Sequence, residues 1–184
     1  MMQKIKMIKG DITQLPVDAI VNAARASLRP GGGVSGAIHR AAGPKLKKLC
    51  QQQRHQQGFC QTGHAVITDA GNLPSRKVIH AVGPVWWWGW RAALKQSQLA
   101  CAYQNSLLLA VEYGLKTIAF PAISTGHYHF PRVLAARIAI TTVRDFLKSN
   151  HVIRQVIFVC FREKDAAIYH AALDFYLNGE NDLC

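Results

Sequence analysis

Short apolar stretches alternate with longer amphipathic stretches along most of the chain. The short stretches are rich in β-branched residues and predict strands at residues 4–8, 19–21, 64–68, 78–82, 117–120 and 155–161. The longer stretches have helical spacing and predict helices at residues 33–42, 44–56, 92–113, 131–148 and 164–177. Because buried-type strands alternate with helices, we expect a largely parallel or mixed sheet covered by helices on both faces.

Local signals support the ends of several of these helices. Pro44 stands at the first turn of the second helix, and Gly114 follows the third helix as a C-cap. No linker, internal repeat or low-complexity segment divides the chain. We therefore expect a single α/β domain over residues 1–184, with its core at about residues 5–177 and a frayed tail after Asn178.

Composition narrows the class of protein. Of the 184 residues 49% are hydrophobic, which is typical of a globular protein, and no run of about 18 apolar residues suggests a membrane span. The basic start of the chain lacks the apolar stretch of a signal peptide. The cysteines are odd in number and form no C-x-x-C pair, so neither a disulfide framework nor a metal site is expected. The cytoplasm is the expected location.

The charge is strongly positive. Its formal value is +12, and the basic residues are scattered rather than gathered in one run. A field that attracts anions, such as phosphorylated small molecules, is therefore favoured over a dedicated nucleic-acid arm.

Two glycine-bearing segments are candidate phosphate sites. Residues 31–36 read Gly-Gly-Gly-Val-Ser-Gly and lead into a helix, so their amides and the helix dipole can cradle a diphosphate. Residues 124–128 read Ser-Thr-Gly-His-Tyr, follow a strand and precede a helix, and can form a second phosphate loop. Considered alone, each segment is also compatible with an ordinary turn, with Tyr128 half-buried in the second.

A carboxylate follows the first predicted strand. Asp11 can accept a hydrogen bond from an exocyclic amine such as that of adenine. It can equally cap the turn that follows it.

The order of these segments is more specific than any one of them. Along the chain stand 11–13 (Asp-Ile-Thr), 22–24 (Asn-Ala-Ala), 31–34 (Gly-Gly-Gly-Val), 36–43 (Gly-Ala-Ile-His-Arg-Ala-Ala-Gly) and 123–126 (Ile-Ser-Thr-Gly). This order resembles the signatures of macro domains, over about residues 5–177. The likeness is greatest to the MacroD-type branch, which includes bacterial O-acetyl-ADP-ribose deacetylases.

The resemblance implies a three-layer α/β/α fold with a central mixed sheet, an ADP-ribose ligand and no cofactor. It implies that Asp11 holds the adenine amine, with Ile12 and Phe161 lining the adenine pocket. It also implies that Tyr128 lies along the distal ribose. The remaining ligand-binding positions that it implies are Asn22, Ala23, Gly32, Gly33, Val34, Ser124, Thr125, Gly126 and His127.

Two positions depart from the family pattern where catalysis would occur. Arg25 stands where the family usually has Asn, which orients the distal ribose, and Ser35 stands where it usually has Asp, which helps to activate water. Arg25 can block the distal end, swing out and leave it loose, or point into solvent. Ser35 is a far weaker base than a carboxylate. His39 lies one helical turn after Ser35, and either transfers protons or packs while satisfying a backbone group.

The basic residues of this region suggest a ligand preference. If Arg25, Arg29, Arg40 and His39 lie near one pocket, the distal end is expected to prefer a more anionic ligand, such as ADP-ribose with a distal phosphate.

Four tryptophans occur in the five positions 86–90 and are followed by Arg91. Either Trp86 and one neighbour pack in the core while the others lie on the surface, or an exposed patch stacks bases or binds a partner.

Three functions remain open at this point. In the first, the chain is a hydrolase of O-acetyl-ADP-ribose or of ester-linked mono-ADP-ribose, whose activity is attenuated by Arg25 and Ser35. Alternatively it is a non-catalytic ADP-ribose reader, or a regulator associated with RNA or a ribonuclease.

Overall fold

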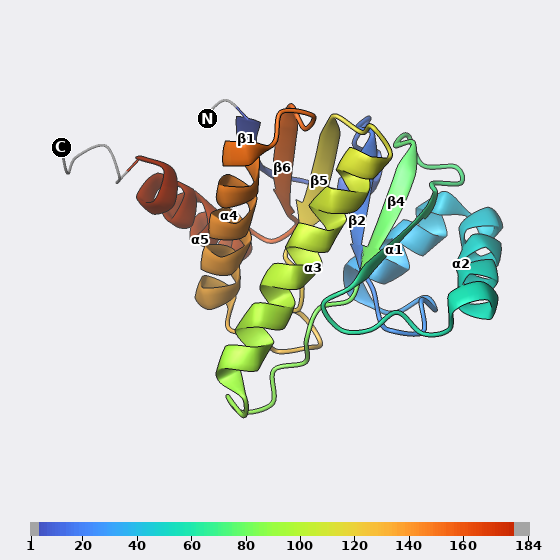
Figure 1. Cartoon of the computed structure of the whole chain (residues 1–184), viewed down its shortest axis with the longest axis horizontal. Coiled ribbons are helices and arrows are strands. Elements are labelled where there is room, and N and C mark those ends of the chain that lie inside the picture. Colours follow the sequence, from blue (N-terminus) through green and yellow to red (C-terminus); the bar gives the residue numbers. More distant parts are fainter. Residues whose placement is uncertain (1–3, 179–184) are drawn as a thin grey trace.

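The computed structural model describes residues 4–178 and has the expected three-layer α/β/α architecture (Figure 1). Its strands are β1 (Ile5–Lys9), β2 (Ala19–Ala23), β3 (Ala65–Asp69), β4 (Lys77–Ala81), β5 (Thr117–Pro121) and β6 (Gln155–Cys160). Its α-helices are α1 (Gly33–Ala42), α2 (Pro44–Gln57), α3 (Ala92–Glu112), α4 (Arg132–Ser149) and α5 (Glu163–Leu173). A 3₁₀ turn (Ile12–Gln14) follows β1, and a π turn (Asp174–Asn178) follows α5. The predicted fold class is confirmed.

The strands form one mixed sheet in the order β1-β6-β5-β2-β4-β3. All neighbouring pairs are parallel except β4 and β3, so β3 is an antiparallel edge strand. The carboxyl ends of the five parallel strands therefore point to one end of the molecule, where ligands of open α/β sheets usually bind.

Both faces of the sheet are covered. Successive residues of β2 point to opposite faces of the sheet. Ala19 and Val21 pack in the hydrophobic cluster formed with α3, α4 and α5, whereas Ile20 packs with α1 and α2. The strands are consequently buried on both sides, as their apolar composition predicts. Figure 1 shows α3 and α4 lying across one face of the sheet.

Most element boundaries agree with the predictions within one or two residues, and residues 33–42 agree at both ends. The strand predicted at 155–161 ends at Cys160, because β1 and β6 pair only as far as Lys9 and Cys160. The helix predicted at 164–177 begins at Glu163, is α-helical to Leu173 and continues as the π turn to Asn178. The predicted fraying after Asn178 concerns residues outside the described range.

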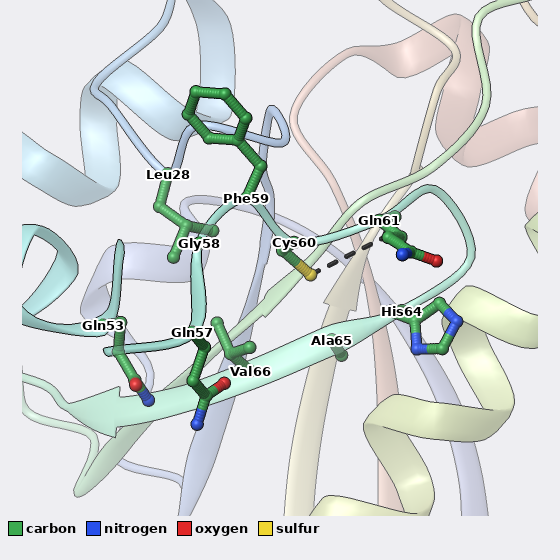
Figure 2. Close-up of a pocket in the computed structure, with 10 residues that line it drawn as sticks. All are labelled: Leu28, Gln53, Gln57, Gly58, Phe59, Cys60, Gln61, His64, Ala65 and Val66. Carbon is green, nitrogen blue, oxygen red and sulfur yellow. Dashed lines mark hydrogen bonds between the residues drawn. The ribbon is translucent and has the colours of Figure 1, made fainter. Parts of the chain in front are cut away.

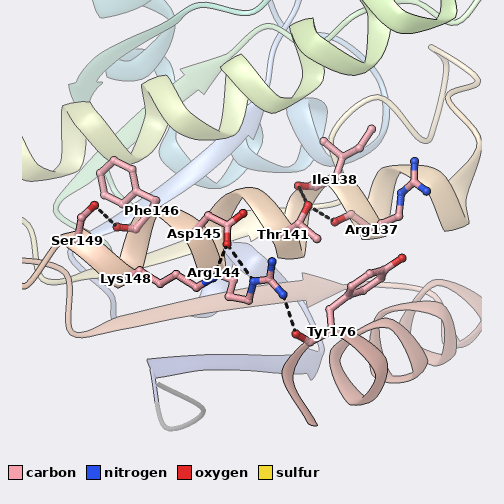
Figure 3. A network of polar contacts seen from close by, with 9 residues as sticks. All are labelled: Arg137, Ile138, Thr141, Arg144, Asp145, Phe146, Lys148, Ser149 and Tyr176. Atoms are coloured by element: carbon pink, nitrogen blue, oxygen red, sulfur yellow. Dashed lines mark hydrogen bonds and ion pairs between the residues drawn. The ribbon is translucent and has the colours of Figure 1, made fainter. Parts of the chain in front are cut away.

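The C-terminal end of α4 carries a polar network that links this helix to the π turn after α5 (Figure 3). Arg144 donates to Asp145 through Nε at 3.0 Å and to the carbonyl of Tyr176 through Nη1 at 3.2 Å. Lys148 Nζ also lies 3.1 Å from Asp145 Oδ1. The carboxylate of Asp145 is thus balanced by two basic side chains at the end of α4 remote from the carboxyl ends of the parallel strands.

Candidate functional site

The first glycine segment forms the beginning of α1. Gly32 is the N-cap and provides no side-chain cap, and the first turn contains no acidic residue. The amides of Gly33, Val34 and Ser35 donate no hydrogen bond within residues 4–178. Because an uncapped helix start carries partial positive charge, these three amides can bind an anion.

The second segment is the loop between β5 and α4. Ser124 has a φ of 66°, which turns the chain back so that Phe130 N donates to its carbonyl at 3.0 Å. The amides of Gly126, His127 and Tyr128 donate no hydrogen bond to any described residue. Successive free amides in a turn form a second place for an anion.

The two segments that carry the free amides meet at Gly32 and His127. A Cβ built on Gly32 would stand 3.2 Å from Cε1 of His127, so the imidazole covers the start of α1. On the other side of the loop, a Cβ on Gly83 would lie 2.1 Å from Ser124 Oγ, so only glycine allows the chain after β4 to approach so closely. The arrangement brings free amides from two loops to one place, as a diphosphate requires.

The prospective adenine end lies beyond β1. Asp11 accepts hydrogen bonds through Oδ1 from the amide and hydroxyl of Thr13, at 2.9 and 2.8 Å. The capping interpretation of Asp11 is therefore confirmed, but within the described chain its Oδ2 has no partner. Ile12 is buried, while Phe161 is 79% exposed and follows the strand that neighbours β1. Asp11 and Phe161 are linked through Gly10, whose amide donates to Cys160.

The prospective distal end contains buried polar atoms without partners. Ser35 and His39 are buried on α1 one turn apart. In the described part of the chain, Ser35 Oγ and both ring nitrogens of His39 make no hydrogen bond. The interpretation in which His39 satisfies a backbone group is therefore wrong. Burial lowers the pKa of His39, so its ring is neutral near pH 7. Unpartnered buried polar atoms are costly and often belong to a functional site.

Asn22 is supported by a hydrogen bond with His80, a residue to which the sequence analysis assigns no role. Asn22 Nδ2 lies 3.1 Å from His80 Nδ1, and His80 Nε2 lies 3.0 Å from Thr68 Oγ1. Burial, aided by the neighbouring His39, lowers the pKa of His80 to about 3. A neutral His80 that accepts at Nδ1 orients the amide and leaves Asn22 Oδ1 without a partner within residues 4–178. A histidine inside an otherwise apolar predicted strand is the sequence signal by which His80 could have been recognised as a buried polar residue.

The comparisons with known proteins decide the family. A model described as Macro domain matches residues 21–139. A protein named O-acetyl-ADP-ribose deacetylase from Escherichia fergusonii is 57% identical over 173 residues, which are 94% of this chain and 97% of that protein. The chain belongs to the macro domain family. A protein of the same name from Salmonella typhimurium is 56% identical, over 92% of this chain and 93% of its own length.

Solved macro domains have the same fold. A mutant Oceanobacillus iheyensis macrodomain with ADPR is 42% identical, with a TM-score of 0.91 over 96% of this chain and 95% of that one. A Trypanosoma brucei macrodomain in complex with ADP-ribose is 38% identical, with a TM-score of 0.82 over 92% of this chain and 68% of that one. The three-layer fold of this macro domain is thus shared along almost its whole described length.

Arg25 lies across the first glycine turn of the macro domain. A Cβ on Gly31 would stand 3.2 Å from its Nη2 and 3.6 Å from its Nε. Arg40 Nη1 similarly lies 3.2 Å from a Cβ built on Gly36, whose Cβ would also meet the carbonyl of Gly31 at 2.6 Å. Two guanidinium groups therefore flank this turn. Arg29 is exposed.

Other features lie outside this region. A pocket of about 280 Å³ lies between the end of α2 and β3 and includes none of the predicted site residues (Figure 2). Within residues 4–178, Cys50, Cys60, Cys101 and Cys160 are free. No cluster of three or more metal-binding side chains occurs in this part of the chain, and none of its helices is long and apolar enough to cross a membrane.

Proposed function

We propose that this macro domain binds ADP-ribose, with the diphosphate between the free amides of α1 and those of the loop after β5. The observation that carries the proposal is the contact of His127 with Gly32, which joins the two groups of amides. Relatives of similar length named O-acetyl-ADP-ribose deacetylase, and related macro domains solved with ADP-ribose, support this ligand.

The adenine is proposed to lie beside Asp11, Ile12 and Phe161. Oδ2 of Asp11 is free to accept from the exocyclic amine, while Oδ1 holds the turn in place. The exposed ring of Phe161 gives the base an apolar face to pack against. On this assignment the diphosphate and distal ribose run from there toward His127 and Tyr128.

At the distal ribose we propose slow hydrolysis of an acyl ester such as O-acetyl-ADP-ribose. Water adds to the ester carbonyl, the bond from the acyl carbon to the ribose oxygen breaks, and acetate and ADP-ribose are released. Neutral His39 can accept the proton from water and return it to the leaving oxygen. Ser35 Oγ can position the water but cannot replace a carboxylate as a base.

Arg25 is proposed to slow this reaction further. Its guanidinium rests against Gly31, where it can pair with phosphate oxygens. A cation does not offer the neutral acceptor and donor pair with which an amide grips ribose hydroxyls. Arg25 and Ser35 together favour a second candidate, a reader that binds ADP-ribose and turns it over very slowly. An association with RNA or a ribonuclease, compatible with the charge of +12, is a third candidate.

The test is one pair of assays on purified protein. Release of acetate from O-acetyl-ADP-ribose and of ADP-ribose from mono-ADP-ribosylated protein is followed for the wild type and for an Arg25→Asn, Ser35→Asp double variant. We expect the double variant to be at least about tenfold faster, which corresponds to about 1.4 kcal/mol in the barrier. A His39→Gln variant should lose the wild-type rate but retain ADP-ribose binding.

Two results would count against this account. If the wild type is as fast as the double variant, the two departures from the family pattern do not limit catalysis. If the wild type binds no ADP-ribose in calorimetry, the assignment of the free amides to the diphosphate is wrong.

A further inference from the structure

The segment between β4 and α3 exposes three large aromatic rings. Trp87 is 66% exposed, Trp88 94% and Trp90 61%. Trp86 alone packs inward, edge-on against Phe130 with ring centroids 4.7 Å apart. Trp86 therefore packs against the core, as one of the two interpretations predicts, but that interpretation is wrong in packing a neighbouring tryptophan with it. The exposed rings of residues 87–90, together with Arg91, are called the tryptophan platform below.

The platform is a formed turn held to the proposed ligand site. Trp86 N donates to the carbonyl of Tyr128 at 2.7 Å, which fixes the start of the segment to the loop that bears free amides. Trp90 N donates to Trp87 O at 2.9 Å, and Trp88 has a φ of 47°. The rings of this turn are therefore exposed beside the proposed distal ribose. The turn lies on the connection from β4 to α3 (Figure 1).

A cation belongs to the platform. The Arg91 guanidinium lies 4.4 Å from the centroid of the Trp90 ring. This places a fixed positive charge among stackable rings, while one face of Trp90 is covered by the guanidinium. Trp87 and Trp88 are the more exposed rings and have faces available to a planar ligand.

The charged residues around the tryptophan platform indicate which kind of ligand it can bind. Between Asp69 and Asp145 the chain has one acidic residue, Glu112, at the opposite end of the 21-residue helix α3, about 30 Å from its start. Neither α3 nor α4 has an acidic residue in its first turn. Lys95 stands in the first turns of α3 beside the platform. The region therefore attracts polyanions, and an acidic phosphate backbone is complementary to it.

We propose that the tryptophan platform binds single-stranded RNA, whose unpaired bases stack on Trp87 and Trp88 while Arg91 and Lys95 contact its phosphates. Exposed aromatic rings combined with basic side chains are the usual means of holding single strands. RNA fits better than duplex DNA because its loops and ends present unpaired bases. This binding is independent of ADP-ribose hydrolysis, although it lies next to the proposed distal ribose.

The test uses a fluorescein-labelled 12-nucleotide RNA of mixed sequence and fluorescence anisotropy on the full chain. We expect the Trp87→Ala, Trp88→Ala double variant to bind at least about tenfold more weakly than the wild type. Phe59 is an exposed ring outside the platform, on the rim of the α2–β3 pocket, so Phe59→Ala should bind as the wild type does. ADP-ribose calorimetry on each variant verifies folding and keeps this test separate from the proposed function.

A second pair of variants tests the charge. Arg91→Ala with Lys95→Ala should lower the salt dependence of RNA affinity by a slope of about 1.4, since each phosphate contact on a single strand contributes about 0.7. Lys47→Ala with Lys48→Ala on α2 is the matched control and should leave the slope unchanged.

Four results would overturn the proposal. They are the absence of RNA binding by the wild type, an equal loss in Phe59→Ala, equal binding of a duplex of the same sequence, and tighter binding of the corresponding single-stranded DNA. If the wild type binds no RNA, a protein becomes the expected partner of the exposed rings.

Discussion

The imidazole of His127 lies on the backbone of Gly32 and thereby joins the start of α1 to the loop after β5. With 3.2 Å between a Cβ at position 32 and Cε1 of His127, a larger side chain must displace the imidazole ring. We expect Gly32→Val to weaken ADP-ribose binding at least about tenfold, or about 1.4 kcal/mol, by calorimetry. Phe59→Ala is the control, because this exposed ring lies at the pocket between α2 and β3, away from the proposed ligand site. Equal affinities in the two variants would contradict the role of this contact.

The approach of Gly83 to the same loop leads to a prediction about stability. A Cβ at position 83 would stand 2.1 Å from Ser124 Oγ and 2.5 Å from Ile123 Cγ2, both in buried residues. Gly83→Ala should therefore lower the free energy of unfolding by about 1–3 kcal/mol in a urea titration. Gly10→Ala, where a Cβ meets nothing within 4 Å, should lower it much less. If Gly10→Ala lowered the free energy of unfolding more than Gly83→Ala, the loop after β5 would have to move freely away from Gly83.

Buried His80 makes stability depend on pH. Its pKa is about 3 in the folded chain, against 6.5 for the free side chain. The unfolded chain therefore takes up a proton below about pH 6.5 while the folded chain does not, so stability is lost as the pH falls from 6.5 toward 3. From pH 7 to pH 5 we expect His80 to cost about 2 kcal/mol of unfolding free energy.

The measurement is a urea titration at both pH values, accompanied by NMR of the His80 ring. A ring that stays neutral at pH 5 together with the loss of stability supports the assignment. Protonation of His80 in the folded chain near pH 6 would contradict it.

The guanidinium groups of Arg25 and Arg40 beside the first glycine turn predict a preference for extra negative charge. ADP-ribose with a phosphate at its distal 1″ position should bind more tightly than ADP-ribose itself in calorimetry. In Arg25→Gln the difference should shrink, most clearly at low salt, because one of the two cations is lost. Weaker binding of the phosphorylated ligand by the wild type would refute this prediction.

The sequence predicts the architecture well because the determining pattern is local. Apolar strands and capped helices follow from composition and spacing, and residues 33–42 were predicted to the residue. Strand ends were less accurate, since they depend on pairing partners such as Cys160 that lie far away in the chain.

The site is predictable only in part. Its glycine loops are visible as motifs, but the contact of His127 with Gly32 joins residues that are 95 positions apart. The support of Asn22 by His80 likewise requires the β2–β4 pairing. The exposure of Trp88 depends on a left-handed turn that the tryptophan run itself does not specify.

The central claim is that ADP-ribose places its diphosphate on two groups of free amides. The most direct measurement is a titration of ¹⁵N-labelled protein with ADP-ribose, followed by amide chemical shifts. The account predicts the largest shifts at Gly33, Val34 and Ser35 and at Gly126, His127 and Tyr128. Shifts confined to the pocket between α2 and β3, around Phe59 and Gln61, would contradict it.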